Sequence, residues 1–220
     1  TASIMPTPQL KVRNISFSAT LPVWEALDQL DLISKLVPGW EVVRSAPQRN
    51  ALHKYTVDRH LVECVIQASA LTRKVDRPDL LLLAALFHDF GKARTGDHSE
   101  VGAALVGEVL GHMGYSAADI GVVTLVVRHH LLLADTATRR DLDDPATIAS
   151  VTAVIPDLQT LELLHALSIS DGQATGNTAW SSWKASLVSD LVNRVKKQIS
   201  GVGLPPQPEF SESEKDLAKS

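Results

Sequence analysis

The chain has 220 residues, of which 45% are hydrophobic and 21% charged, and its formal net charge is −4. This composition is typical of a globular protein with a sizeable core, and it argues against a disordered chain and against nucleic-acid binding through a basic surface. A single cysteine, Cys64, excludes an intrachain disulfide framework and favours a reducing compartment, so we expect a cytoplasmic location. The longest apolar stretches, around 79–87 and 120–127, are too short to span a bilayer, and no export signal is visible, so no membrane contact is expected. Because the first residue is Thr1 rather than methionine, we expect a piece of a longer chain.

The spacing of apolar residues predicts an all-α fold of about eight helices, with glycine and proline at their ends and no sustained period-two alternation. Residues 1–21 are expected to form an N-terminal arm, 22–201 the folded domain, and 202–220 a C-terminal linker. In chain order, helices are expected over residues 22–37, 53–73, 78–88, 97–114, 116–133, 145–153, 156–172 and 179–200.

One apolar helix ends in an unusual way. The run PDLLLLAALF (78–87) is followed by His88 and Asp89 rather than by more core or a plain turn. Burying such a pair without a strong partner is costly, which favours a functional role. The turn that follows contains Gly91 and Lys92 and places an ammonium group near the same point, where it would stabilise the negative charge of a phosphate.

Three other side chains are candidates for the same site. His60 lies on one helix face with Cys64 one turn later and His53 two turns earlier. Asp171 is expected at the end of a helix, just before a glycine. His60, His88, Asp89 and Asp171 thus form a plausible ligand set for a divalent metal, with positions left open for water and substrate. Isolated histidines such as His112 and His165 are interpreted as ordinary surface or core residues.

The arrangement His60 … His88-Asp89-x-Gly-Lys92 … Asp171 resembles the HD superfamily of metal-dependent phosphohydrolases, an all-helical fold. More closely, four blocks are similar in order to the HD domain of the bifunctional PII uridylyltransferase/uridylyl-removing enzymes, and the resemblance covers about residues 22–200. These blocks are HKYTVDRH (53–60), FHDFGKARTGDHSEVGA (87–103), VVRHHLLLADTATRRDLDDP (126–145) and the SISDGQATG…WSSWK segment (168–184).

The resemblance implies a metal site and a division of roles within it. His60, His88, Asp89 and Asp171 would hold a first metal ion. His98 and the His129-His130 pair match positions that bind a second ion in the binuclear branches of the superfamily. Alternatively, these histidines bind substrate phosphate or support the first set. The ion would be Mn²⁺, Mg²⁺ or Fe²⁺, with one or two per chain.

Further residues are expected to act on the substrate. Asp89 would bridge the metals or orient the attacking water, and Lys92 would offset charge in the transition state. Substrate-binding candidates, each of which is equally explained as a solvated charge or an ordinary helix residue, are His53, Arg128, Arg139, Arg140 and Lys184. Trp180 and Trp183 would add a stacking wall beside Lys184, although tryptophans more often pack into a core.

The implied reaction is hydrolysis of a phosphodiester that joins a nucleotidyl group, UMP or AMP, to a tyrosine of the PII nitrogen-signalling protein. The transferase motif of such enzymes, Gly-Ser followed by Asp-x-Asp, does not occur here, and the regulatory ACT domains are expected beyond the linker. Two alternatives remain: a phosphohydrolase of small-molecule nucleotides, and a catalytically inactive HD module that binds a nucleotide or a partner.

Overall fold

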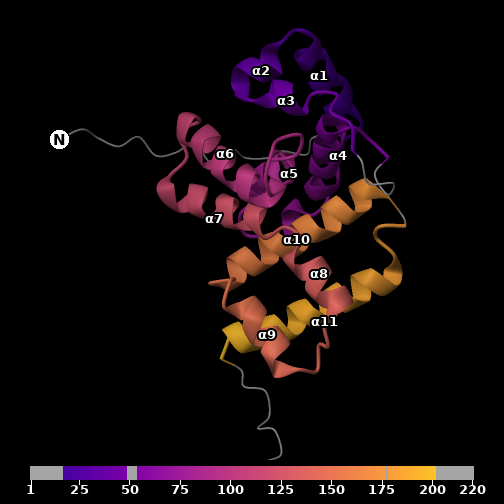
Figure 1. Ribbon diagram of the computed structural model, residues 1–220, viewed down its shortest axis with the longest axis vertical. Helices are drawn as coiled ribbons and strands as arrows, with labels where there is room; N and C mark the ends of the chain where they lie inside the picture. Colours follow the sequence, from indigo (N-terminus) through magenta and orange to yellow (C-terminus); the bar gives the residue numbers. More distant parts are fainter. Residues whose placement is uncertain (1–16, 49–53, 177, 202–220) are drawn as a thin grey trace, which may run out of the picture.

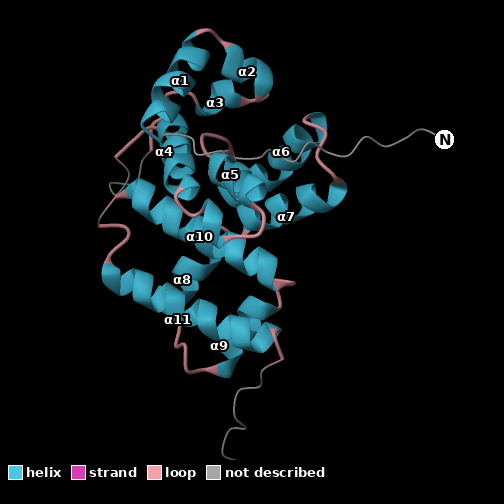
Figure 2. Ribbon diagram, turned by 180° about the vertical axis from the view of Figure 1, so that it is seen from behind, coloured by secondary structure: helices cyan, strands magenta, loops and turns pink. Residues whose placement is uncertain are grey.

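The chain folds into helices wherever apolar residues recur with helical spacing, as the computed structural model shows for residues 17–48, 54–176 and 178–201. Within those ranges there are eleven α-helices, one 3₁₀ turn and no strand, which confirms the all-α prediction (Figures 1 and 2). The elements are α1 (Phe17–Gln29), α2 (Leu32–Leu36), α3 (Trp40–Val43), α4 (Val57–Ser69), η1 (Thr72–Lys74), α5 (Pro78–Phe87), α6 (His98–His112), α7 (Ala117–Arg128), α8 (Leu132–Arg139), α9 (Pro145–Thr152), α10 (Leu158–Thr175) and α11 (Ser182–Ile199).

Three helices form the middle of the molecule. α4 packs against α5 and α10, and α10 also crosses α5 (Figure 1). The short helices α1–α3 lie at one end of this group, while α8, α9 and α11 pack together at the other end. α6 and α7 form an antiparallel pair that packs on α5 through α7. The elements that later contribute to the site therefore belong to the α4–α5–α10 group or pack on it, and α6 does so through α7.

The hydrophobic core extends through all of these groups of helices. Among its fully buried large side chains are Trp40, Leu61, Phe87, Leu133 and Leu164, which come from α3, α4, α5, α8 and α10. Burying a side chain of this size stabilises the fold by about 1.5–3 kcal/mol. α5 is apolar on nearly all sides, as expected for a helix that is enclosed by its neighbours.

The first expected helix, 22–37, is two helices. α1 begins before Pro22 and ends at Gln29, and α2 begins at Leu32. Asp31, between them, has a φ of 55°, a left-handed conformation that interrupts a helix. Arg44 stabilises this corner, because its guanidinium donates to the carboxylates of both Asp28 and Asp31. Apolar spacing alone continues across the corner and does not reveal it.

The expected helix 116–133 also divides. α7 ends at Arg128, a turn covers 129–131, and α8 continues to Arg139, six residues beyond the expected end at residue 133. The segment Ala117–Arg139, which joins α7, the turn and α8, has the length and apolarity of a membrane span. The apolar stretches considered in the sequence, 79–87 and 120–127, are too short to suggest this. The turn inside the segment is irregular backbone, which lipid does not tolerate, and α7 and α8 pack against α5, α6 and α11. We therefore assign this segment to the helical fold.

Helix α10 is longer than expected. It does not end at Gly172 but continues to Thr175, so Asp171 lies inside the helix, about one turn before its end. Gly172 serves packing rather than termination, because a Cβ atom there would lie 2.4 Å from the ring of Trp180. The close approach brings the segment before α11 against α10.

The remaining boundaries are close to those expected. The helix predicted over 53–73 begins at Val57 and ends at Ser69, with η1 after it. α1 begins at Phe17, so the last residues of the expected arm are helical. Residues 1–16 and the expected linker 202–220 lie outside the described residues, and the division into arm, domain and linker stays a prediction.

Candidate metal centre

The site begins where α5 ends. His88 is the C-terminal cap of the helix, and Asp89 follows it at the start of a tight turn. Gly91 sits in this turn against the beginning of α6, where a Cβ atom would lie 2.0 Å from the carbonyl oxygen of His98 and 2.5 Å from the amide of Gly102. Only glycine permits this approach, which places His98 beside the His88-Asp89 pair.

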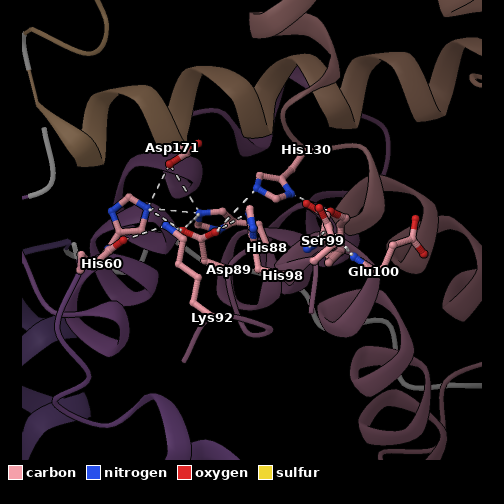
Figure 3. A network of polar contacts seen from close by, with 12 residues as sticks. His60, His88, Asp89, Lys92, His98, Ser99, Glu100, His130 and Asp171 are labelled. Atoms are coloured by element: carbon pink, nitrogen blue, oxygen red, sulfur yellow. Dashed lines mark hydrogen bonds and ion pairs between the residues drawn. The ribbon is translucent and has the colours of Figure 1, made fainter. Parts of the chain in front are cut away.

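A first group of side chains meets at the end of α5 (Figure 3). His60, from the middle of α4, has its Nε2 atom 3.2 Å from Nε2 of His88 and 3.0 Å from Oδ1 of Asp171. Nε2 of His88 lies 3.5 Å from the same oxygen of Asp171. Both imidazoles are buried, and the Asp171 side chain is partly exposed. Three ligand atoms from three helices therefore converge on one point.

A second group lies on the other side of Asp89. His98, the first residue of α6, and His130, just after α7, each bring Nε2 to 3.7 Å from Oδ1 of Asp89. The other carboxylate oxygen, Oδ2, faces the first group, at 3.4 Å from His88 Nε2 and 3.7 Å from His60 Nε2. The buried Asp89 carboxylate therefore lies between the two groups and presents one oxygen to each.

Backbone carbonyls orient two of the histidines. Nδ1 of His88 donates to the carbonyl of Ala85 at 2.9 Å, and Nδ1 of His130 donates to the carbonyl of Val127 at 2.7 Å. In each ring the hydrogen bond to the preceding turn leaves Nε2 directed at the carboxylates. Metal-binding histidines are held by this kind of contact, which sets both the tautomer and the ring orientation.

The electrostatics of the site favour ionised carboxylates. Burial opposes ionisation of Asp89, but the positive charges of His88 and Lys92 hold the pKa of this carboxyl below its usual range. The same balance between burial and the charge of His88 holds the pKa of Asp171 well below its usual range. Burial lowers the pKa of His130 to about 4, so this imidazole stays neutral at pH 7. Although burial opposes it, the charge of Asp89 raises the pKa of His88 well above its usual range. Anionic carboxylates and neutral imidazoles are the forms that bind metals, so a metal ion at this centre would take the place of the proton on His88.

Lys92 lies at the edge of the first group. Its ammonium contacts Oδ2 of Asp89 at 2.5 Å and donates to Oε1 of Gln48 at 2.7 Å. The side chain is partly exposed. Lys92 therefore places a positive charge next to the carboxylate that joins the two groups.

Both groups open into a cavity of about 930 Å³, a size suited to a nucleotide-sized ligand. Asp89, Lys92, His98, His130 and Asp171 contribute to its wall. Of the predicted substrate-binding residues, Lys184 also lines it, from the first turn of α11, with its ammonium 6.0 Å from the centre of the Trp180 ring. Trp183, next to it in sequence, is 64% exposed rather than packed into the core.

Other predicted residues lie outside the cavity and both groups. His129 caps α7 and belongs to neither group, because its neighbour His130 is the one turned inward. Arg128 pairs with Glu100 at 2.9 Å, and Arg139 pairs with Asp135 at 3.4 Å. Arg140 is exposed and does not line the cavity. His53 lies outside the described residues.

Sequence reasoning missed several residues that line the cavity, including Gln48, Arg94, Asp135 and Thr175. Arg94, Asp135 and Thr175 lie inside the sequence blocks quoted above, and Arg94 follows Lys92 by two residues in the same turn, whereas Gln48 precedes all of those blocks. The blocks do not show which of these side chains faces the cavity, because that depends on how the helices pack.

The donor set fits a divalent metal. Within each group the nitrogen and oxygen atoms lie within 4.8 Å of one another, and they combine imidazole with carboxylate. Two imidazole Nε2 atoms that face each other at 3.2 Å, with carboxylate oxygens on either side, form a centre that a cation stabilises. Mixed nitrogen and oxygen ligands suit Mn²⁺ and Fe²⁺ and accept Mg²⁺ less readily.

Comparison with known proteins agrees with this geometry. Residues 57–162 match the model of the family described as HD domain. Five of the six residues in the two groups lie within that range, and Asp171 follows it.

The chain is also similar to curated proteins named "Bifunctional uridylyltransferase/uridylyl-removing enzyme". It is 51% identical over 216 residues to the protein of Streptomyces coelicolor, which covers 95% of the chain and 26% of that protein. For Mycobacterium tuberculosis H37Rv the identity is 51% over 187 residues, covering 84% of the chain and 23% of the relative. For the protein of Gluconobacter oxydans the identity is 36% over 197 residues, which covers 82% of the chain and 21% of the relative. The chain therefore spans about a quarter of the length of these relatives.

Proposed function

The chain belongs to the HD-domain family, and we propose that it catalyses the metal-dependent hydrolysis of a phosphodiester, removing a nucleotidyl group from a protein. The observation that carries the proposal is the position of Asp89. Its carboxylate is buried, ionised and shared between two groups of metal-binding atoms, on the wall of a cavity large enough for a nucleotide. A structural ion pair needs neither the second group nor the cavity.

In the proposed site, His60, His88 and Asp171 would hold one divalent ion, and His98 and His130 would hold a second, with Asp89 able to serve either. A divalent ion bound there supplies Lewis-acid polarisation of the phosphoryl group and lowers the pKa of a water molecule towards neutrality.

The residues of the chain would then act on the substrate directly. Asp89 orients the attacking water through the oxygen that is not shared with Lys92. Lys92 offsets the charge that develops on the phosphoryl oxygens, and Gln48 holds its ammonium in place. Lys184, which also lines the cavity, contacts the nucleotidyl group.

The proposed substrate is a tyrosine of the PII nitrogen-signalling protein that carries UMP or AMP. The names of the relatives support removal of a uridylyl group, and the sequence blocks around His60, Asp89 and Asp171 support the same family of reactions. The proposal places the chain in the cytoplasm as the nucleotide-removing part of a longer enzyme.

The test combines metal analysis with product release. The 220-residue chain is purified, its metal content is measured by elemental analysis, and nucleotidylated PII is supplied with Mn²⁺ while released UMP or AMP is quantified. One or two ions per chain together with nucleotide release support the proposal, and the released nucleotide identifies the base. If the chain binds metal and hydrolyses free nucleotides but releases none from PII, the proposal is replaced by the alternative that the chain is a phosphohydrolase of small-molecule nucleotides. A chain that neither binds metal nor releases nucleotide would be a binding module.

Asp89→Asn is the variant that addresses the site itself. It retains the shape of the side chain but removes the charge between the two groups, so metal content and activity are both expected to fall, activity by at least about a hundredfold. The matched control is Asp190→Asn, which removes an exposed carboxylate that pairs with Arg194 on α11 and is expected to change neither. Full activity in Asp89→Asn would refute the site assignment.

A further inference from the structure

Among the cations that line the cavity, Arg94 differs from Lys92 in its partners. Lys92 contacts the carboxylate of Asp89, whereas the guanidinium of Arg94 contacts no carboxylate in the described part of the chain. Burial lowers the pKa of Arg94, and among nearby charges only that of Glu41 opposes this effect. A partly buried positive charge thus faces the cavity without a counter-charge of its own.

The guanidinium is nevertheless held firmly in position. Nη1 donates to the carbonyl of Phe90 at 2.6 Å, and Nη2 donates to the carbonyl of Gly39 at 3.0 Å. Its plane lies over the ring of Phe90, at 5.0 Å from the ring centre, and that ring stacks in turn on Trp40. These contacts use two of the five N–H groups of the guanidinium and leave three for a ligand.

The backbone of the turn brings this cation to the wall of the cavity that the metal centre also lines. Ala93, between Lys92 and Arg94, has a φ of 60°, a left-handed conformation that is strained in a residue other than glycine. Both of its neighbours line the same cavity. Strain of this kind persists where the surrounding structure requires it, and here it places two cations on the wall of one cavity.

We propose that Arg94 is a substrate-binding residue that recognises the phosphate of the nucleotidyl group, alongside the metal centre. The inference rests on the proposed function and deepens it, because it names the residue that distinguishes a nucleotide from a neutral nucleoside. A planar guanidinium that is oriented in advance suits the oxygens of a phosphate, which it binds through two parallel hydrogen bonds.

The competing explanation is that Arg94 only ties the turn after Asp89 to the α2–α3 corner through Gly39. Both explanations predict a loss of thermal stability when the side chain is replaced. They differ in ligand binding, since a purely structural clamp has no preference for a charged ligand.

The test measures the affinity of the 220-residue chain for UMP, AMP and uridine by calorimetry in the presence of Mn²⁺, for three variants. Arg94→Gln removes the charge, Arg94→Lys retains the charge without the planar fork, and Arg77→Gln is the matched control. Arg77 is a guanidinium that pairs with Asp79 and Asp119 and lies outside the cavity. Metal content, circular dichroism and melting temperature are recorded for each protein.

We expect Arg94→Gln to weaken the binding of the nucleotide by about tenfold to a hundredfold, with any affinity for uridine unchanged. Arg94→Lys should lie between Arg94→Gln and the wild type, and Arg77→Gln should bind like the wild type at equal metal content. Nucleotide affinity within twofold of the wild type in both Arg94 variants would overturn the inference, and so would an equal loss for uridine. Should Arg94→Gln not fold, Arg94→Lys decides the question.

Hydrolysis of bis(p-nitrophenyl) phosphate by the wild-type chain, measured in parallel, separates the two proposals. Turnover with nucleotide affinity that is independent of Arg94 leaves the proposed function standing and overturns this inference. If the chain does not hydrolyse this substrate but its nucleotide affinity depends on Arg94, the inference about Arg94 stands and the proposed hydrolytic function is overturned.

Discussion

At the scale of single residues, the direction of the backbone decides which of two adjacent histidines, His129 or His130, faces Asp89. His129 and His130 are identical in chemistry, but α7 ends at Arg128, just before them, and the turn that follows directs only His130 at Asp89. The hydrogen bond from His130 to the carbonyl of Val127 then fixes its ring. His129 is left as the cap of the helix.

The pair provides a matched experiment. We expect His130→Ala to lose at least one bound metal ion per chain and most of the hydrolytic activity, because it removes one of three ligands of the second group. His129→Ala should retain both, since its ring belongs to neither group. Elemental analysis of the two purified variants checks this, and equal metal content in both would contradict the assignment of His130.

Gly91 supports the site without touching a ligand. In Gly91→Ala the new methyl group would overlap the carbonyl of His98, so α6 has to move and the free energy of unfolding should fall by about 1–3 kcal/mol. For a chain of this length that corresponds to a fall in Tm of about 2–12 °C, measured by thermal melting.

The control for that variant is Gly121→Ala. Gly121 lies in α7, where an added Cβ atom meets nothing within 4 Å, so alanine should leave stability unchanged or raise it by up to about 1 kcal/mol. A wild-type Tm for Gly91→Ala would show that α6 does not need the close approach.

At the scale of elements, helix ends determine which side chains meet. α5 begins with Pro78, and Arg77 before it donates to the carboxylates of Asp79, in the same helix, and Asp119, in the first turn of α7. Hydrogen bonds from Arg77 hold the pKa of both carboxyls below their usual range. The starts of α5 and α7 are therefore joined by a bridge that depends on pH.

The sign of this dependence follows from the lowered pKa values. A carboxyl whose pKa is lower in the folded chain than in the unfolded chain contributes stability above about pH 4, and that contribution is lost as the pH falls further. The pairs are partly exposed and screened by water, so each is worth no more than about 1 kcal/mol. Arg77→Gln should therefore melt about 2–8 °C below the wild type at pH 7, with a difference that shrinks towards pH 3. A difference that stays constant or grows on acidification would rule out this origin.

At the scale of the whole molecule, the candidate centre draws on five helices or their ends. His60 comes from α4, His88 and Asp89 from the end of α5, His98 from α6, His130 from the end of α7, and Asp171 from α10. Each of the two groups of three ligand residues takes its members from three different helices or helix ends. Metal binding should therefore be coupled to folding of the domain, because unfolding separates the ligands by long stretches of chain.

This coupling is measurable as a shift in melting temperature. With free Mn²⁺ at about a hundred times its Kd, the stability of the folded chain should rise by about 2.7 kcal/mol, or roughly 5–10 °C in Tm. A chelator should reverse the shift, and Asp89→Asn should largely abolish it. A shift of equal size in Asp89→Asn would place the stabilising ion somewhere else.

The sequence alone determined the helical class and the family, and it predicted most residues of the candidate site, which stay a prediction. The signals for the helices and for the end of α5 have physical reasons that act locally. Helix periods, a proline at the start of α5 and a histidine–aspartate pair at its end are patterns within a few residues of one another. Such patterns reflect backbone propensity and the cost of burying polar groups, and neither requires knowledge of the rest of the chain.

Only the tertiary structure decided between His129 and His130, placed Asp171 inside α10 rather than at its end, and brought Arg94 to the wall of the cavity. Each of these outcomes depends on contacts between residues far apart in sequence. Trp180 packs on Gly172, the Gly39 carbonyl accepts from Arg94, and Gly91 meets the backbone of α6. Packing of this kind sets the direction of a helix end or a side chain, because it is the arrangement of neighbouring elements, and not the local period, that fixes where each helix stops.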